Sequence, residues 1–166
     1  TFNRNSDKII KGQIYMYKAD LEILNSIFLN TTSKYATAIF CEESCDVIIN
    51  NTKFRNLYAN KTAGAIAGKQ NINMNINDNE FDNVSSANNG GAIFLDILGD
   101  NKNARGLIEI TRCKFNNCYS SFGGAILQLD GTLIVRDSEF TSNNAEYEGG
   151  AIYTSFSTVG IADSKF

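Results

Sequence analysis

Apolar and polar positions recur along this chain with a period of about 26 residues, and every period carries the same arrangement. Its most regular position is a phenylalanine, and the intervals between successive members are 26, 26, 27, 34, 25 and 26 residues. Self-similarity at a fixed period of this length is the signature of a repeat architecture. The recurring residues are Phe2, Phe28, Phe54, Phe81, Phe115, Phe140 and Phe166.

The residues before each phenylalanine alternate between apolar and polar. In the coil of Phe54, Val47 and Ile49 stand seven and five residues ahead of it, and the other coils place Leu, Ile, Met or Val there. A period of two is expected of a strand with one buried face. The polar pair Asn51 and Thr52 adds one position before the phenylalanine. This addition predicts a bulge or kink that keeps both halves facing the core.

A second strand, with the sequence Ala-Ile or a close variant, begins 10 to 12 residues after each phenylalanine. Glycines before it supply a positive-φ turn, and the alanine is small enough for a tight corner. An asparagine two residues after the phenylalanine is expected to be a left-handed turn residue or part of a stacked amide ladder. No stretch has the helical periodicity of a full helix. The predicted repeat core comprises Phe28, Phe54, Phe81, Phe115, Phe140, Ile39, Ile66, Ile93, Ile126 and Ile152.

Strands repeated at this period without helices favour a parallel β-helix, in which each strand pairs with its equivalent in the next coil. Six intervals at the usual strand spacing predict a rod roughly 30 Å long. Leucine-rich repeats have a similar period, but their Leu-rich consensus is absent from this chain.

The Gly-Gly-Ala-Ile blocks at 90–93, 123–126 and 149–152 alternate with Phe-x-(x)-Asn blocks. This alternation resembles the repeats of the polymorphic outer membrane protein family over essentially the whole chain. The strict Phe-x-x-Asn form occurs at Phe140 to Asn143, whereas most coils place the asparagine one position earlier. The resemblance implies an all-β fold, a right-handed parallel β-helix (solenoid), here with about six coils of roughly 26 residues. It also implies a surface protein, since such repeats occur in surface proteins of bacteria, archaea and protists.

We expect residues 1–166 to form a single β-helix segment, the interior of a longer chain. One coil departs from the period, with fourteen residues between Ile93 and Ile108 where other coils have six or seven. The excess forms a polar insertion loop at 99–106. Insertions in solenoids project from one face and often make contacts, although a lengthened loop is also tolerated without any function. The candidate recognition residues of this loop are Asp100, Asn101, Lys102, Asn103 and Arg105.

The net charge is −3 and the sequence pI is about 5.0, so electrostatic attraction to nucleic acid has no source. No apolar stretch approaches the length of a membrane span, so we expect no direct membrane insertion in this segment. Proline is absent, which suits strands that all need their N–H groups for ladder bonds.

Four cysteines bear on the compartment of the chain. Cys41 and Cys45 lie four residues apart in the turn to the next coil, where a local disulfide would pin that turn. Cys113 and Cys118 either form a second disulfide or are two buried thiols that act as small apolar residues. The chain contains no histidine, and we expect no metal site and no cofactor.

Asn-x-Ser/Thr sequences, the acceptors of N-linked glycans, begin at Asn30, Asn50, Asn60 and Asn83. A chain this rich in Asn, Ser and Thr contains several such sequences by chance. Asn60 is expected to be the most accessible, because it lies in a polar turn. Asn30 and Asn83 also belong to the asparagine column, where they are expected to be turn residues.

Many β-helices cleave polysaccharides, with acids and bases gathered on outward positions of neighbouring coils. This chain lacks histidine, the side chain most often used as a general base near neutral pH. Asp96 and Asp130, which follow Ala-Ile strands in successive coils, are the acids to consider for catalysis or for a cation. We do not expect an enzyme and assign no catalytic residue.

Aromatic residues beside the Ala-Ile strands form a candidate surface for stacking on sugar rings or on a partner. They alternate with the inward isoleucines, so an outward orientation is expected. Alternatively, another part of the chain or of its assembly covers this sheet. The residues are Tyr15, Tyr17, Phe40, Phe94 and Tyr153.

These patterns favour a secreted or cell-surface structural or adhesive protein, such as a stalk, an adhesin or a filament subunit. Its partners would be other protein chains or surface glycans, and the open coil ends would allow axial self-association. The alternatives are a carbohydrate-active enzyme, either a polysaccharide lyase or a hydrolase, and a carbohydrate-binding module. An enzyme requires clustered outward acids and bases with perturbed pKa values, and a binding module requires an exposed aromatic stripe.

Overall fold

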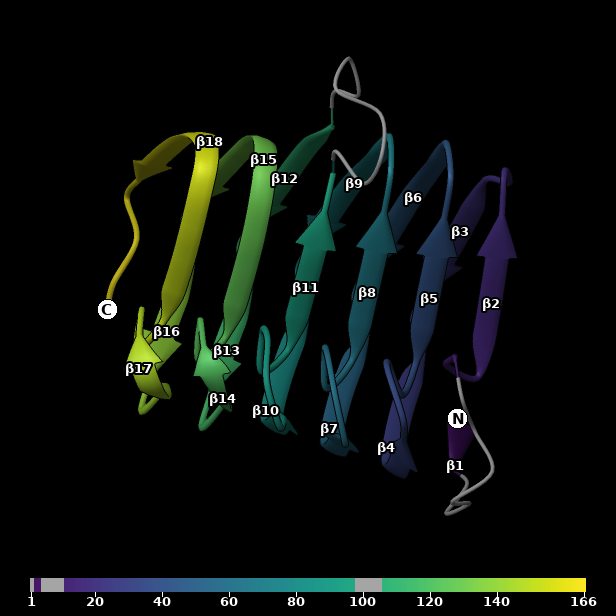
Figure 1. The fold of residues 1–166 in the computed structure, drawn as a ribbon, viewed down its shortest axis with the longest axis horizontal. Coiled ribbons are helices and arrows are strands. Elements are labelled where there is room, and N and C mark those ends of the chain that lie inside the picture. Colours follow the sequence, from purple (N-terminus) through teal and green to yellow (C-terminus); the bar gives the residue numbers. More distant parts are fainter. Residues whose placement is uncertain (1, 4–10, 98–105) are drawn as a thin grey trace.

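The chain forms an all-β parallel solenoid of about five turns with ~26-residue spacing, seen in Figure 1 as successive coils stacked side by side. The computed structural model describes residues 2–3, 11–97 and 106–166, and within these ranges there is no helix. Every strand pairs in parallel with its equivalent one coil away, as the repeat predicts. The number of turns is slightly lower than the predicted six.

Three faces surround the core. The Ala-Ile face contains β2 (Ile14–Tyr17), β5 (Ile39–Glu42), β8 (Ile66–Lys69), β11 (Ile93–Asp96) and the first halves of β15 (Ile126–Arg136) and β18 (Ile152–Ala162). The middle face contains β3 (Leu21–Leu24), β6 (Cys45–Asn50), β9 (Ile72–Asn77), β12 (Leu107–Thr111) and the second halves of β15 and β18. The Phe face contains β1 (Phe2–Asn3), β4 (Ile27–Ser33), β7 (Lys53–Ala59), β10 (Glu80–Ser86), β13 (Lys114–Asn116), β14 (Tyr119–Phe122), β16 (Glu139–Thr141) and β17 (Asn144–Glu148).

The phenylalanine column forms the centre of the core. Phe81 lies in register with Phe54 and Phe115, and the rings are stacked at 4.6 Å from both neighbours, 2 to 4° from parallel. The column extends to Phe28 and Phe140 with the same stacking. The isoleucines of the predicted core are fully buried except Ile152, in the last coil, which is partly buried. The predicted core is therefore confirmed, and like residues stack on like residues along the axis.

The additional residue before each phenylalanine produces a kink at a corner of the coil. Asn51 and Asp78 have left-handed backbones there, with φ of 48° and 55°, and the equivalent residues of the other coils do the same. Asparagine and aspartate tolerate this region best, which explains why they recur. Arg112 replaces them in one coil, and its guanidinium makes two hydrogen bonds to the Asp78 carboxylate of the preceding coil, at 2.8 and 2.7 Å.

A column of small polar side chains lies beside this corner, inside the coil. The backbone N–H of each member donates to the side chain of the equivalent residue one coil later; for example, Thr52 N donates to Asn79 Oδ1 at 2.8 Å. Cys113 continues the column, because its N–H donates to Ser138 Oγ at 3.1 Å. These bonds satisfy backbone donors that the corner removes from the strand ladder. The column comprises Ser26, Thr52, Asn79, Cys113, Ser138 and Ser164.

The predicted asparagine ladder is also present. Asn56, Asn83 and Asn117 each donate through Nδ2 to Oδ1 of the asparagine in the preceding coil, at 3.1, 2.9 and 3.4 Å. Asn30 is the first member of this ladder, and all four have φ between 51° and 54°. The asparagines therefore combine both predicted roles, since they turn the chain and stack along the axis.

Neither predicted disulfide is present, because all four cysteines are free, buried thiols. Cys41 and Cys113 face the core from different coils, and Cys41 Sγ lies 3.9 Å from Met16 Sδ. Burial raises the pKa of Cys113 to about 11 and that of Cys118 to about 12, and it also raises the pKa of Cys41. The second pair thus matches the alternative interpretation of two thiols that act as small apolar residues.

These thiols are expected to be unreactive in the folded chain. At pH 8 a thiol-specific disulfide reagent should modify the native protein far more slowly than the urea-denatured protein, because burial excludes the reagent from all four thiols and raises the pKa of Cys41, Cys113 and Cys118. The denatured chain should yield all four thiols, with the absorbance of the released product as the measurement. Fewer than four thiols in the denatured chain would indicate disulfides, and fast modification of the native chain would contradict their burial.

The aromatic column beside the Ala-Ile strands is covered by the chain over most of its length. Phe40 and Phe94 are buried in a second apolar cluster outside the sheet, together with Ala63 and Leu127. Tyr35 packs edge-on against Phe40, with ring centroids 6.3 Å apart. The expectation of a continuous outward stripe is therefore wrong at these positions, because the turns that follow the Phe face fold back over the Ala-Ile sheet.

Candidate functional site

The two acids considered for catalysis lie in neighbouring coils, one position apart in the strand register. Asp96 ends β11 and lies opposite Leu129 of β15, whereas Asp130 stands one residue later at a left-handed corner with φ 62°. Within the described ranges, no group of three His, Cys, Asp or Glu side chains is arranged to hold a metal ion. The five residues considered for recognition in the insertion, Asp100 to Asn103 and Arg105, lie outside the described residues.

The acids with perturbed pKa values are partners in ion pairs on the surface. The pKa of Glu42 is lowered by hydrogen bonds from Lys11, at 2.6 Å, and from Tyr15, at 2.7 Å. Arg112 lowers the pKa of Asp78 in the same way. A general acid needs the opposite shift, towards a protonated carboxyl at neutral pH. The ion pairs account for these shifts through bonds between neighbouring coils.

A row of alternating charge runs along the Phe face, at the position directly before the last five phenylalanines of the repeat. Glu80 lies between Lys53 and Lys114 in the strand register, and its carboxylate is 3.3 Å from Lys53 Nζ. Arg55 adds a second contact to Glu80 at 2.6 Å. Sequence reasoning missed this row, although alignment of the coils on their phenylalanines reveals it. The row comprises Lys53, Glu80, Lys114, Glu139 and Lys165.

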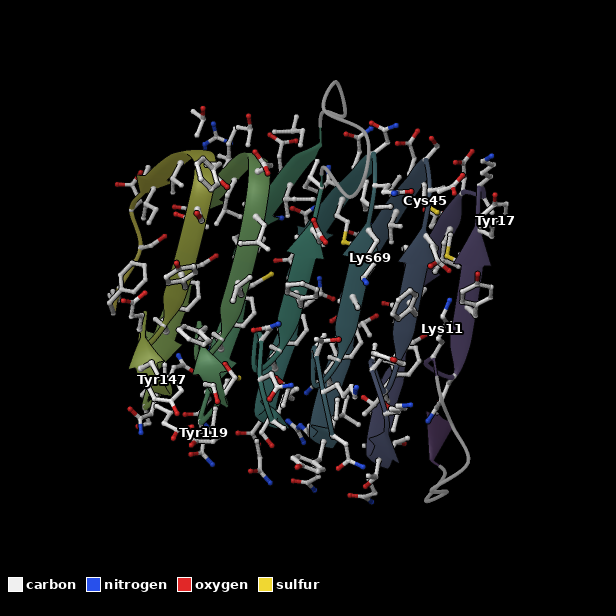
Figure 2. The ribbon with its side chains drawn as sticks, viewed as in Figure 1. Lys11, Tyr17, Cys45, Lys69, Tyr119 and Tyr147 are labelled. Atoms are coloured by element: carbon white, nitrogen blue, oxygen red, sulfur yellow. The ribbon has the colours of Figure 1, made fainter. Side chains whose placement is uncertain are left out.

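Exposed tyrosines also lie on the Phe face, and Figure 2 labels two of them, Tyr119 on β14 and Tyr147 on the neighbouring strand β17. Tyr58 and Tyr119 occupy the same row two coils apart, both in register with Ser85, and are 42% and 44% exposed. Tyr147, in β17, is 65% exposed. We call Tyr58, Tyr119 and Tyr147 the tyrosine surface. The sequence carried a signal for it, since Tyr58 and Tyr119 each stand four residues after a phenylalanine of the repeat.

Polar groups surround the tyrosine surface. Glu146 Oε2 accepts a hydrogen bond from Ser121 Oγ at 3.0 Å, and a hydrogen bond to Glu146 raises the pKa of Tyr147. The Phe122 ring packs against the Tyr147 ring, with centroids 5.2 Å apart. A rigid aromatic ring beside a carboxylate and hydroxyl groups can stack on an apolar ring face and bind hydroxyl or amide groups at its edge. The arrangement suits the recognition of a glycan or of a protein surface.

A second set of exposed aromatics lies on β2, where Figure 2 labels Tyr17; Lys11, also labelled, precedes this strand. Tyr15 is half-exposed and bonded to Glu42, while the hydroxyl of Tyr17 donates to Glu43 Oε2 at 3.2 Å. Lys11 Nζ lies 4.8 Å from the centre of the Tyr15 ring. Of the predicted aromatic surface, Tyr15 and Tyr17 are exposed as expected. Tyr153 is partly buried and packs against Phe122.

The middle face has a shallow groove of about 310 Å³ over β6, β9 and β12. Ile48 and Leu107 are exposed in it, and Asp46 and Asn73 are held by bonds between coils: Asn73 Nδ2 donates to Asp46 Oδ1 at 2.8 Å, and Leu107 N donates to Asn73 Oδ1 at 3.0 Å. The groove is lined by both polar and apolar side chains, none of them aromatic.

No helix within the described residues is long and apolar enough to span a membrane. No family model matches the chain, and no solved structure matches it either. The chain is similar to "Metabotropic glutamate receptor-like protein R" of Dictyostelium discoideum, with 27% identity over 160 residues that make up 95% of the chain. It spans about 9% of the length of that protein. The similarity thus concerns one segment of a much longer receptor-like protein.

Proposed function

We propose that this chain is a structural and adhesive β-solenoid module of a cell-surface or secreted protein. The observation that carries the proposal is the tyrosine surface, which presents exposed aromatic rings from a scaffold bonded along its whole axis. The similarity to a receptor-like protein supports a surface location. The repeats of Gly-Gly-Ala-Ile and Phe-x-(x)-Asn, which resemble those of the polymorphic outer membrane protein family, are consistent with the same location.

In this proposal the solenoid acts as a rigid scaffold that holds the side chains that contact a partner at fixed positions. Stacked rings, the asparagine ladder and the column of small polar side chains link each coil to the next, so the outward side chains keep fixed spacings. A partner therefore meets a surface that is already ordered, which lowers the entropic cost of binding. The partners we propose are surface glycans or other protein chains, and stacking of coil ends would add axial self-association.

A carbohydrate-active enzyme and a carbohydrate-binding module are the alternatives. An enzyme needs a positioned acid and base, whereas the shifted carboxyl groups in this chain belong to ion pairs with Lys11, Arg112 or Arg55. We therefore propose a role without catalysis. A carbohydrate-binding module would use the same exposed aromatic rings to bind a glycan, so the tyrosine surface suits it as well as an adhesin.

Removal of two rings is expected to weaken adhesion about tenfold, which is the usual loss when central aromatic contacts are truncated. Beads coated with the chain should bind to intact cells of the producing organism, and the double variant Tyr119→Ala/Tyr147→Ala should bind about tenfold less, as counted by flow cytometry. Phe156→Ala is the matched control, because Phe156 is 89% exposed and outside the tyrosine surface.

Equal binding of the double variant and the parent would exclude the tyrosine surface as the adhesive site. Competition by soluble glycans would identify a sugar ligand, and competition by protease treatment of the cells would identify a protein ligand. Labelling of intact cells with a membrane-impermeant amine reagent tests the surface location separately, since the exposed lysines Lys61 and Lys114 should react.

A further inference from the structure

The four Asn-x-Ser/Thr sequences are equivalent in sequence, but the structure places their asparagines in different environments. An N-linked glycan is attached through Nδ2, so this nitrogen must face solvent and must not be needed for a bond inside the fold. The hydroxyl residue two positions later must also be reachable, because it is part of the recognised sequence. These requirements separate the four candidates.

Asn83 and Asn50 fail these requirements. Asn83 lies within the asparagine ladder, where its Nδ2 donates to Asn56 Oδ1 at 2.9 Å. A sugar on that nitrogen would occupy the space between two coils that stack at about 4.8 Å. Asn50 accepts a bond from Asn77 Nδ2 at 3.3 Å, and Thr52, the hydroxyl residue of its sequence, is 1% exposed inside the corner column.

Asn30 is the first described member of the same ladder. Its Oδ1 accepts from Asn56 Nδ2, so its own Nδ2 is directed along the axis away from Asn56. That direction leads to the coil of β1, which pairs with β4 through Phe2 and Phe28. A glycan on Asn30 would therefore extend along the stacking axis rather than out from a face of the solenoid.

Asn60 meets the requirements. It is exposed in the turn that leaves β7, and its backbone N–H is bonded to Ser33 O at 3.0 Å, which holds the turn in place. Its side-chain amide has no hydrogen-bond partner among the described residues. Lys61 is exposed beside it and Thr62 is partly exposed, with a backbone bridge to Asn89.

We propose that Asn60 is the N-glycan acceptor of this chain. In the reaction, Nδ2 of Asn60 forms a bond to the anomeric carbon of a sugar on a lipid-diphosphate-linked oligosaccharide. The bond from that carbon to the diphosphate breaks, the lipid diphosphate leaves, and the amide proton passes to a base of the transferase. The inference rests on the proposed function, because the chain must enter a secretory pathway to meet this donor.

The test uses the full chain behind a secretion signal in a eukaryotic host, with peptide mass mapping before and after removal of N-glycans by an amidase. We expect sugar on Asn60 and none on Asn30, Asn50 or Asn83. Asn60→Gln and Thr62→Ala should each abolish the mass shift. Ser85→Ala is the matched control, because it destroys the Asn83 sequence while Asn83 stays in the ladder, and it should leave the shift unchanged.

A bare Asn60 in the secreted chain, or sugar on any of the other three asparagines, would overturn the proposal. The same map on natural material separates this failure from failure of the proposed function. If Asn60 carries sugar in the secreted chain and none in natural material, the acceptor assignment holds, and the natural chain does not pass through a secretory pathway that carries this donor. If both carry sugar on Asn60, both proposals are supported.

Discussion

Replacement of Phe81 by alanine is expected to lower the free energy of unfolding by about 3 to 5 kcal/mol. Phe81 is fully buried between Phe54 and Phe115, and both of its neighbours stack on it at 4.6 Å. Truncation removes both stacking contacts and leaves a cavity that the two rings cannot fill, because the ladder bonds hold the coils at a fixed spacing. Urea denaturation followed by circular dichroism measures the loss.

Phe166→Ala provides the matched control. Phe166 occupies the same position of the repeat and stacks on Phe140 at 4.7 Å, but it is 65% exposed. Its truncation should cost less than about 1 kcal/mol, because little area leaves the core. If Phe81→Ala also cost less than about 1 kcal/mol, the phenylalanine column would not be the main source of stability.

Replacement of Gly124 by alanine is the second change with a large expected effect. A Cβ at Gly124 would lie 2.0 Å from the carbonyl oxygen of Gly150 and 2.5 Å from that of Asn144. Both contacts are backbone atoms of the next coil, so relief of the clash requires the coils to separate at this corner. We expect a loss of about 3 kcal/mol, at the upper end of the usual cost of overpacking.

Gly150→Ala tests the same repeat position without the clash. Its nearest contact would be Asn143 O at 3.6 Å, an ordinary van der Waals distance. This variant should unfold within about 0.5 kcal/mol of the parent, as surface substitutions usually do. Equal losses for the two variants would mean that the cost comes from backbone conformation rather than from the close approach of coils, and would contradict our explanation.

These two experiments also bear on function. Both changes weaken contacts between coils and leave the tyrosine surface chemically intact, so they separate the scaffold from the recognition residues. If adhesion depends on the fixed spacing of Tyr58 and Tyr119, Phe81→Ala should weaken adhesion under conditions in which the chain begins to unfold. The double variant Tyr119→Ala/Tyr147→Ala should weaken adhesion even under conditions in which the chain is fully folded.

Much of the fold was predictable because it repeats. The alternation around Val47 and Ile49, the recurrence of phenylalanine and the absence of helical periodicity were sufficient to predict parallel strands in register and a core built from columns. The asparagine ladder was predictable for the same reason, since an asparagine at the same position of four successive coils lies next to the asparagine of the neighbouring coil. The corner before each phenylalanine was predicted as a bulge or kink, whereas its left-handed backbone, shared by Asn51, Asp78 and Arg112, is visible only in the structure.

The surface was less predictable, because exposure depends on which segments fold over which face. Phe40 and Phe94 stand at outward positions of their strands, yet the turns that follow the Phe face bury them. Nothing in a local pattern shows how far such a turn folds back. The prediction of a Cys41–Cys45 disulfide was wrong for a similar reason. The spacing of the two cysteines permits a bridge, but the fold places both side chains in the core as free thiols.

For the candidate sites, too, the sequence identified the residues and the tertiary structure decided which of them are accessible. The sequence alone identified the four Asn-x-Ser/Thr motifs and the aromatic residues near the Ala-Ile strands. Packing between coils separated Asn60, whose amide has no hydrogen-bond partner within the described ranges and lies in an exposed turn, from Asn83, whose amide is bonded inside the ladder. It also placed Tyr119 and Tyr147 on two neighbouring paired strands, β14 and β17. Periodicity specifies which residues share a column, whereas the exposure of a column depends on contacts between segments that are distant in the chain.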